Sequence, residues 1–302
     1  MRISNQQLFE NSVNQMTQQH SKVADLQSRI AEGKQLLNPS DNAEKTALIQ
    51  RLNSALGRQK VYESTLDSVS ARLDLEESTI RSSTDMLQRL KELALLSNDG
   101  SISSSDRATR VFAEVTQLRE GLLSQANQQD MNGNYVFSGS DVQSAAFTEI
   151  SGIITYSGNQ DNMAVDISET RYFTLNRPGD AIFSNIDRGG VDVGFFQVID
   201  DFISALGTNT GTDIERALSE IDTLSNNMAE AIGDVGARQR TVDSQKNIIA
   251  DTKLRYELML NAETELDYTL AITQLTSEML SLEAAQASFA KISQLSLFDY
   301  IR

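Results

Sequence analysis

Large apolar side chains recur every seven residues near both ends of this chain, and this repeat limits what the ends can fold into. Near the N-terminus the repeat consists of Phe9, Met16, Val23, Ile30 and Leu37, with Val13 and Leu26 between them. Near the C-terminus it consists of Tyr268, Ile272, Leu275, Met279, Leu282, Phe289, Ile292 and Leu295. A mean apolar spacing of about 3.5 residues forms the seam of a coiled coil. We therefore predict a coiled-coil helix at each end.

The two predicted seams are imperfect, because Gln19, Gly33 and Gln286 stand where apolar residues are expected. A polar residue in a coiled-coil seam lowers stability while restricting how helices pair. Two long helices that bury only one seam are marginally stable alone. The remaining burial is therefore expected to come from other copies or a partner, which is typical of an assembly protein.

The stretch "LQSRIAEGKQLLNPSDNA" (26–43) predicts a sharp break between the first helix and the next. Pro39 lacks a backbone donor and disfavours helix at the residue before it, Asn38. Ser40 or Asp41 is a suitable cap for a new helix, with Glu44 as a capping-box partner of Asp41. Residues 38–41 are therefore predicted to end the terminal helix and redirect the chain.

The rest of the chain divides into helical stretches around a middle piece rich in glycine. Of the 16 glycines, ten fall between Gly133 and Gly211. There "GIITYSG", "NMAVDIS" and "TRYFTLN" are short strand candidates bounded by turn residues. The expected fold is mainly α with a small β domain. The predicted parts are a first terminal helix (1–40), helices over 41–134, a β-rich domain (135–200), helices over 201–253, and a second terminal helix (254–302).

Composition excludes several classes of function. The 302 residues carry a net charge of −16, and an acidic chain repels nucleic-acid phosphates. With no cysteine, thiolate catalysis and zinc–thiolate sites are excluded. No apolar run approaches the length of a membrane span, and the N-terminus lacks the apolar core of a secretory signal. We therefore expect no nucleic-acid or membrane partner.

No catalytic, cofactor-binding or metal site is predicted. The single histidine, His20, lies among polar residues on a helix and is interpreted as solvated. The stretch after Asp99 superficially resembles a calcium loop, but Ser104 replaces the required glycine and Arg110 replaces the final glutamate. A nucleophile, a base and a group to orient them cannot be assembled from this sequence, so an enzyme is not expected.

Four segments, in order, resemble the bacterial flagellin family. They are "LQSRIAEGKQLLNPSDNA" (26–43), "LQRLKELALLSNDGSISSSDR" (87–107), "EVTQLREGLLSQANQQDMNGNYVFSG" (114–139) and "LEAAQASFAKISQLSLFDYIR" (282–302). Within the family, "MRIS", "NGNYVFSGSDV" and "KISQLSLFDYI" are most similar to the hook-associated proteins of the hook–filament junction. A minor filament flagellin is the alternative within the family. A helical binding module from another class would share the heptads but not the four ordered segments.

The resemblance implies a structural subunit of the bacterial flagellum outside the cell. Its terminal helices would pack in an inner tube, the neighbouring helices would form a rod domain, and the β piece would project outward. The implied partners are further copies in a ring, the other junction protein, filament flagellin and a cytoplasmic export chaperone that holds the C-terminal helix. The chain would leave the cell unfolded through the flagellar export channel.

A weaker implication concerns a surface that an innate immune receptor reads in filament flagellins. Arg89, Leu93 and Glu114 match its positions. Subunit contacts in the tube would explain the same residues and are the preferred interpretation, since matched residues need no second role.

Overall fold

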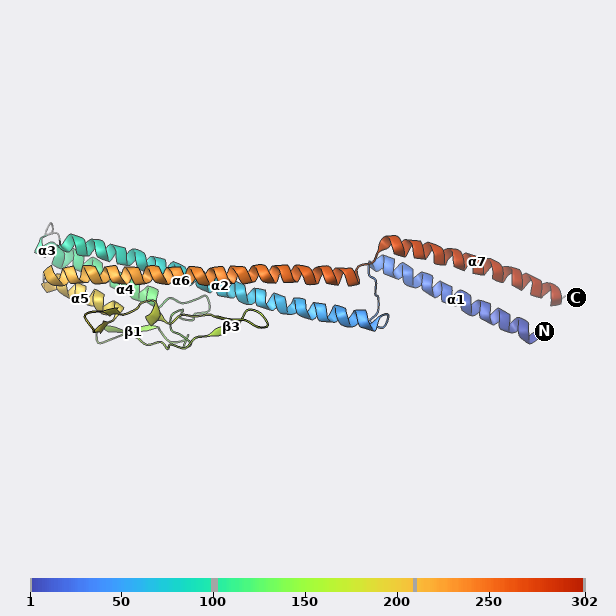
Figure 1. Ribbon diagram of the computed structural model, residues 1–302, viewed down its shortest axis with the longest axis horizontal. Helices are drawn as coiled ribbons and strands as arrows, with labels where there is room; N and C mark the ends of the chain where they lie inside the picture. Colours follow the sequence, from blue (N-terminus) through green and yellow to red (C-terminus); the bar gives the residue numbers. More distant parts are fainter. Residues whose placement is uncertain (1, 99–102, 209–210, 301–302) are drawn as a thin grey trace. The chain divides into compact units, whose positions relative to one another are not determined.

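The computed structural model describes residues 2–98, 103–208 and 211–300 as two compact units (Figure 1). The terminal unit comprises residues 1–58 and 251–302, and the central unit comprises residues 59–250. Two long helices, α2 (Ala43–Asn98) and α6 (Gly211–Thr264), contribute to both units. Within the described residues, no helix is both long and apolar enough to cross a membrane.

In the terminal unit, helices α1 (Arg2–Glu32) and α7 (Tyr268–Tyr300) lie side by side and run antiparallel (Figure 1). The first turns of α2 and the last turns of α6 also belong to this unit, and Lys45 Nζ lies 3.2 Å from Glu263 Oε2 across them. The terminal unit therefore brings together chain segments separated by more than 190 residues of the central unit.

In the central unit, α2 and α6 run antiparallel and carry a heptad-like row of buried side chains. On α2 the buried row comprises Leu66, Val69, Leu73, Ile80, Leu87, Leu90 and Leu93. On α6 it comprises Ile214, Ala217, Ile221, Leu224, Met228, Ala231, Val235, Val242 and Ile249. Such periodic apolar rows are what hold helix pairs together in water. At their rim Lys91 pairs with Asp222 and Lys246 with Asp67.

Shorter helices complete the α layer of the central unit. The chain passes through α3 (Ser104–Asp106) and a π-helical turn (Arg107–Val111) into α4 (Phe112–Ala126). Helix α5 (Phe195–Thr208) packs on α4 and is apolar over much of its surface. Arg119 of α4 donates to both oxygens of Asp200 on α5 and to Glu149, which fixes the two helices against a strand.

The β piece consists of three separate two-stranded antiparallel hairpins. They pair β1 (Phe147–Ile150) with β2 (Ile153–Tyr156), β3 (Ala164–Asp166) with β4 (Tyr172–Thr174), and β5 (Ile186–Asp187) with β6 (Asp192–Val193). A 3-10 turn, η2 (Gly179–Ala181), lies between the second and third hairpins. The first hairpin closes through Ser151 (φ 55°) and Gly152 (φ 85°), a two-residue turn whose positive φ angles match the twist of the strands.

One end of the β piece is attached to the helices by aromatic packing. Phe183 makes edge-on contacts with Phe137, Phe147 and Phe195, with ring centroids 5.7, 5.5 and 5.2 Å away, and Phe196 stacks at 6.3 Å. An isolated hairpin is at best marginally stable in water, so burial against these rings is what holds the strands.

Polar side chains of the long helices also attach the β piece. Arg72 donates to the Val136 carbonyl at 2.8 Å, and Arg238 donates to the Thr174 carbonyl at 2.8 Å. Arg238 also lies over the Phe173 ring and 3.3 Å from Glu76, which is 1% exposed. Each of these contacts satisfies a backbone or charged group that burial would otherwise penalise.

The fold class agrees with the sequence prediction: mainly α, long terminal helices and a small β region. Helix α2 lies within the stretch 41–134 that is predicted to be helical and begins two residues after its start. The prediction of one second terminal helix over 254–302 is wrong, because the chain leaves helix at 265–267. Asp267 accepts from the Leu270 amide and so caps a new helix there.

The predicted cap of α2 is also wrong in detail. Asn42 accepts from the Lys45 amide, while Asp41 accepts from the amides of Leu37 and Asn38 and stabilises the turn. The strands β2, β3 and β4 lie inside the three predicted strand segments. The domain limits drawn at 134/135 and 200/201 stay predictions; the strands themselves span 147–193, and α5 begins at Phe195.

Candidate assembly surfaces

Helices α1 and α7 meet along a narrow seam. Val23 on α1 and Ala271 on α7 are buried, and the Phe9 and Phe289 rings lie 4.9 Å apart at the far end of the pair. Lys22 and Glu278 flank the seam with 4.0 Å between Nζ and Oε1. Small side chains such as Ala271 let the two helices approach closely.

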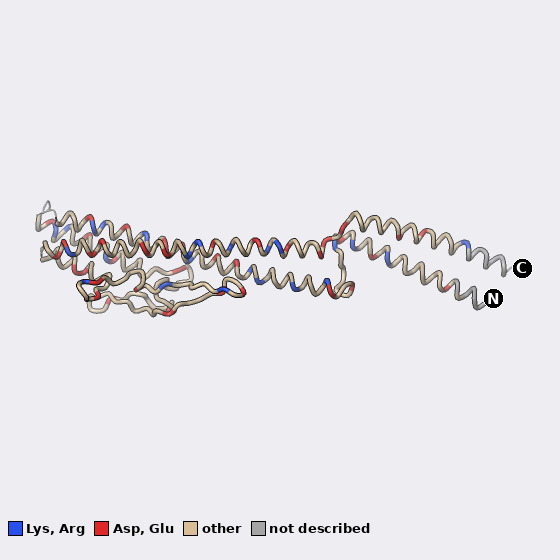
Figure 2. Tube along the Cα trace, in the orientation of Figure 1, with Lys and Arg blue, Asp and Glu red and all other residues tan. Residues whose placement is uncertain are grey.

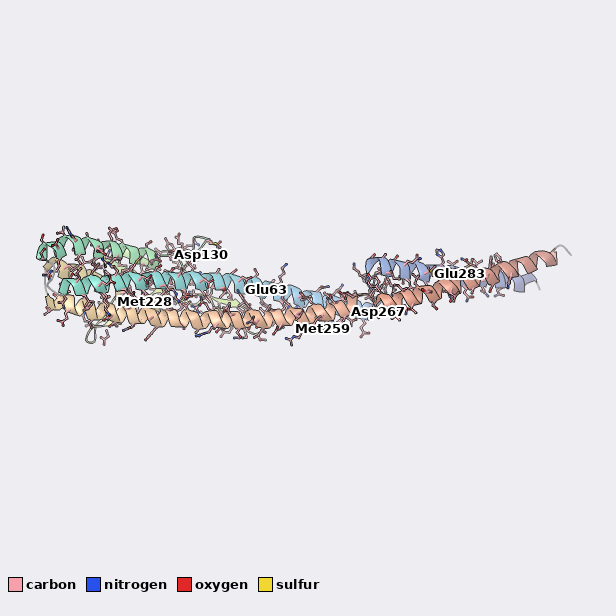
Figure 3. The ribbon with its side chains drawn as sticks, turned by 90° about the horizontal axis from the view of Figure 1, so that it is seen from above. Glu63, Asp130, Met228, Met259, Asp267 and Glu283 are labelled. Atoms are coloured by element: carbon pink, nitrogen blue, oxygen red, sulfur yellow. The ribbon has the colours of Figure 1, made fainter. Side chains whose placement is uncertain are left out.

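In the part of helix α7 whose side chains are described, there are two apolar rows, and α1 covers one of them. The inner row, Ala271, Leu275, Leu282, Ala285 and Phe289, is buried or half-buried against α1. The outer row, Tyr268, Ile272 and Met279, is exposed at 51%, 52% and 44%. Figure 2 shows few charged residues along the described part of α7, and Figure 3 labels one of them, Glu283. An exposed apolar row on a nearly uncharged helix marks a surface suited to a further contact.

The structure therefore divides the predicted C-terminal seam between two faces. Leu275, Leu282 and Phe289 face α1, whereas Tyr268, Ile272 and Met279 do not. The sequence analysis missed Ala271 and Ala285 because it counted only large apolar residues. A periodicity count that included alanine would have found the inner row. The side chains of Ile292 and Leu295 lie outside the described residues.

On α1 the predicted residues Met16, Leu26 and Ile30 are half-buried, and Phe9 is 46% exposed. Gln19 lies within this seam, and its Oε1 is buried without a hydrogen-bond partner among the described atoms. Gln286 is exposed and so does not interrupt the contact with α1. The polar interruption predicted at this position therefore belongs to the outer face of α7.

Two predicted seam positions lie beyond the end of α1. Gly33 has φ +68°, the left-handed conformation that ends a helix, so it does not interrupt a seam as predicted. Leu37 lies in the connector to α2 and lines an apolar cleft of about 240 Å³ with Leu36, Pro39 and Ile49. The four residues predicted as a helix break, Asn38, Pro39, Ser40 and Asp41, lie between α1 and α2.

The surface matched to a flagellin receptor site contains an ion pair and a core residue. Arg89 Nε donates to Glu114 Oε1 at 2.6 Å, and its Nη1 donates to Glu92. These bonds raise the pKa of Arg89, mainly through the Glu114 carboxylate, and keep it charged. Leu93 is 2% exposed and belongs to the apolar core. Only Arg89 and Glu114 are therefore presented to solvent; recognition by a receptor stays a prediction.

The carboxylate of Glu76 is buried and has a shifted pKa. Burial raises the pKa of Glu76, although the guanidinium groups of Arg238, Arg177 and Arg72 oppose this. Its neighbours are structural. Arg238 donates both to the Glu76 carboxylate and to the Thr174 carbonyl of β4, and so links the carboxylate to that strand. Among the residues that the structure describes, no group of three or more His, Asp or Glu side chains is placed to hold a metal ion.

Comparisons with known proteins agree with this architecture. The model of the bacterial flagellin N-terminal helical region matches residues 3–142. Flagellar hook-associated protein 3 of Escherichia coli (strain K12) is 24% identical over 317 residues, covering 99% of each chain. The protein of the same name in Salmonella typhimurium is 23% identical and is covered completely, as is this chain.

A solved structure shares the fold. The putative flagellar hook-associated protein from Vibrio parahaemolyticus superposes with a TM-score of 0.69 at 22% identity, over 74% of this chain and 100% of that one. Residues 3–142 thus match the N-terminal helical region of the bacterial flagellins, and the chain along its whole length is similar to flagellar hook-associated protein 3.

Proposed function

We propose that this chain is a structural subunit of the bacterial flagellum that forms part of the junction between hook and filament. The observation that carries the proposal is the similarity to flagellar hook-associated protein 3 over 99–100% of both chains. A match confined to the helical termini would be expected of any flagellin relative, whereas this one includes the middle piece, which varies in the flagellin family.

The proposed location is the flagellum, outside the cell, reached by export of the unfolded chain through the flagellar channel. Local features support this route. The terminal unit buries few apolar side chains, so its helices gain little from folding until they meet further surface. The polar, weakly apolar helices would therefore order fully only on assembly.

The proposed partners are further copies in a ring, the second hook-associated junction protein and filament flagellin. The exposed outer row of α7 supports such packing, since Ile272 and Met279 remain accessible after α1 has covered the inner row. A cytoplasmic chaperone is proposed to cover the C-terminal helix before export. The role is structural rather than catalytic, in keeping with apolar helical surfaces as the features that need a partner.

The test is a clean deletion of the gene in its source cell, complemented in trans with the wild-type gene. The proposal predicts hooks that carry no filament and flagellin monomer released into the medium, both reversed by complementation. Filaments that remain attached, with altered length or antigenicity, would contradict the junction role.

The alternative is a minor filament flagellin, which the match to the flagellin N-terminal region favours. The same deletion separates the two proposals. Immunogold labelling of the wild-type flagellum adds a direct readout: label confined to the hook–filament boundary supports the junction role, and label along the filament supports the alternative.

A further inference from the structure

The segment that follows α1 and the segment that precedes α7 bind each other through backbone hydrogen bonds. Residues 33–35 follow α1, and residues 264–266 comprise the last residue of α6 and the first two of the connector to α7. The Leu266 amide donates to the Gly33 carbonyl at 3.1 Å, and the Gln35 amide donates to the Thr264 carbonyl at 2.9 Å. Lys34 and Glu265 pair as an antiparallel bridge. We call these two segments, with Tyr268, the connector clasp.

Gly33 is the residue that allows this pairing. Its φ of +68° is a conformation that residues with a side chain avoid, and the Lys34 amide donates to the Arg29 carbonyl to close the last turn of α1. A Cβ at Gly33 would lie 2.7 Å from the Tyr268 hydroxyl oxygen. Any other residue would therefore strain the backbone and displace the Tyr268 hydroxyl.

A charged side chain from α2 fastens the clasp on both sides. Lys45 Nζ donates to Gln35 Oε1 at 2.6 Å and pairs with Glu263 Oε2 at 3.2 Å. The connector that follows α1 is thereby tied to the last turn of α6 through side chains as well as through the backbone. Asp267, labelled in Figure 3, caps α7 directly after the clasp, so the helix starts at a fixed residue.

We infer that the connector clasp is a conformational device that makes the ordering of α1 and α7 mutually dependent. Two helices from opposite ends of the chain must meet in one register before their inner rows can pack. The clasp fixes that register at one end: Ala271, the first buried residue of α7, lies three residues after Tyr268, and its amide is held by Asp267. Starting from a fixed end lowers the entropic cost of pairing the rest.

This inference concerns the chain itself and does not depend on the proposed junction role. A terminal unit without the clasp would let either helix order alone or pair out of register. With the clasp, both helices should gain and lose order together, at one solvent condition.

The experiment is hydrogen–deuterium exchange of the purified full chain across a series of trimethylamine oxide concentrations, because this osmolyte favours burial without adding contacts. In the wild type, amides of α1 and α7 are expected to become protected at the same osmolyte concentration. Gly33→Ala is expected to lower protection in both helices about tenfold, the equivalent of roughly 1.4 kcal/mol, which is the cost of a left-handed non-glycine residue.

Two further variants keep the test sharp. Gly57→Ala is the matched control, because a Cβ at Gly57 in α2 meets nothing within 4 Å, and it should leave α1 and α7 unchanged. Tyr268→Phe in the Gly33→Ala background removes the clashing oxygen and should restore part of the lost protection. The inference is overturned if α1 and α7 become protected at different concentrations, if neither does, or if Gly33→Ala behaves as Gly57→Ala. Exchange of the central unit reports separately whether the variants fold.

Discussion

The terminal and central units are built from the same kind of long helix, yet they are stabilised very differently. The continuous apolar core lies entirely in the central unit, from Leu66 to Ile249. In the described part of the terminal unit, the buried apolar residues are Val23, Leu52, Ala55 and Ala271. A helix pair that buries a single seam gains little stability from burial. The stability of the terminal unit therefore depends on further contacts.

The terminal and central units also differ in net charge. Acidic and basic residues nearly balance in the terminal unit, and most of the net charge of −16 lies in the central unit. Copies that pack through neutral, apolar helices avoid the self-repulsion that a strongly acidic unit carries. The central unit thus holds the apolar core and most of the charge, whereas the terminal unit is nearly neutral and leaves apolar helix faces exposed.

The largest expected effect is in the aromatic cluster of the central unit. Phe183 is 1% exposed and touches four other phenylalanine rings. Phe183→Ala should lower the free energy of unfolding by about 3–5 kcal/mol through the cavity it leaves. Urea denaturation followed by circular dichroism measures this. Leu275→Ala, in the half-buried seam of the terminal unit, is the comparison. If Leu275→Ala lowered the stability of the central unit as much as Phe183→Ala does, the two units would not be stabilised separately.

The buried carboxylate of the central unit comes next. Glu76→Ala leaves Arg238 without its carboxylate partner and should cost about 3 kcal/mol, because a buried charge is uncompensated. Glu76→Gln keeps an acceptor and should cost less. Thermal denaturation at neutral pH measures both, and equal losses for the two variants would show that a neutral acceptor cannot replace the carboxylate charge at this site.

The pH dependence of that pair follows from the direction of the shift. Burial raises the pKa of Glu76 in the folded state. The negative charge of Asp234 adds to this rise, and the positive charges of Arg238, Arg177 and Arg72 oppose it. The folded chain therefore binds a proton more readily than the unfolded chain, whose carboxyl titrates near its usual value of 4.5. As pH falls through the raised pKa, the wild type should gain stability relative to Glu76→Gln. Paired urea titrations from pH 7 to 4 measure the difference; a constant difference contradicts the assignment.

A smaller gain is expected in the terminal unit. The Oε1 atom of Gln19 is buried without a partner in the seam, so Gln19→Leu should stabilise the α1–α7 pair by about 1 kcal/mol. Helicity measured by circular dichroism at low temperature reports it. Gln18→Leu, at an exposed neighbouring position, is the control and should change nothing.

The smallest effects are expected at surface ion pairs in either unit. Arg81 and Glu77 form an i,i+4 pair in the central unit, and Lys22 lies 4.0 Å from Glu278 in the terminal unit. Arg81→Ala and Lys22→Ala should each change stability by no more than about 0.5 kcal/mol. Thermal denaturation at two salt concentrations tests this. A larger loss at Lys22 would mean that ion pairing, rather than apolar contact, holds the terminal helices.

The amino-acid sequence alone predicts the helical ends, the helical stretch that contains α2, three of the six strands found among the described residues, and the resemblance to the flagellins. These features depend on local information: heptad spacing, turn residues and ordered motifs that neighbouring residues define. Two-residue strands such as β5 and β6 carry too little pattern to be recognised, because tertiary packing alone makes them extended.

Which apolar residue faces which partner depends on how the helices pack against one another. Ile272 and Leu275 belong to one predicted seam, yet only Leu275 meets α1, because the position of α1 selects one row of α7. Gly33 is a seam interruption by spacing and a helix end by structure, since its partner Tyr268 is more than 200 residues away. Periodicity is a property of one helix, whereas a contact is a property of two, and a single sequence contains only the first.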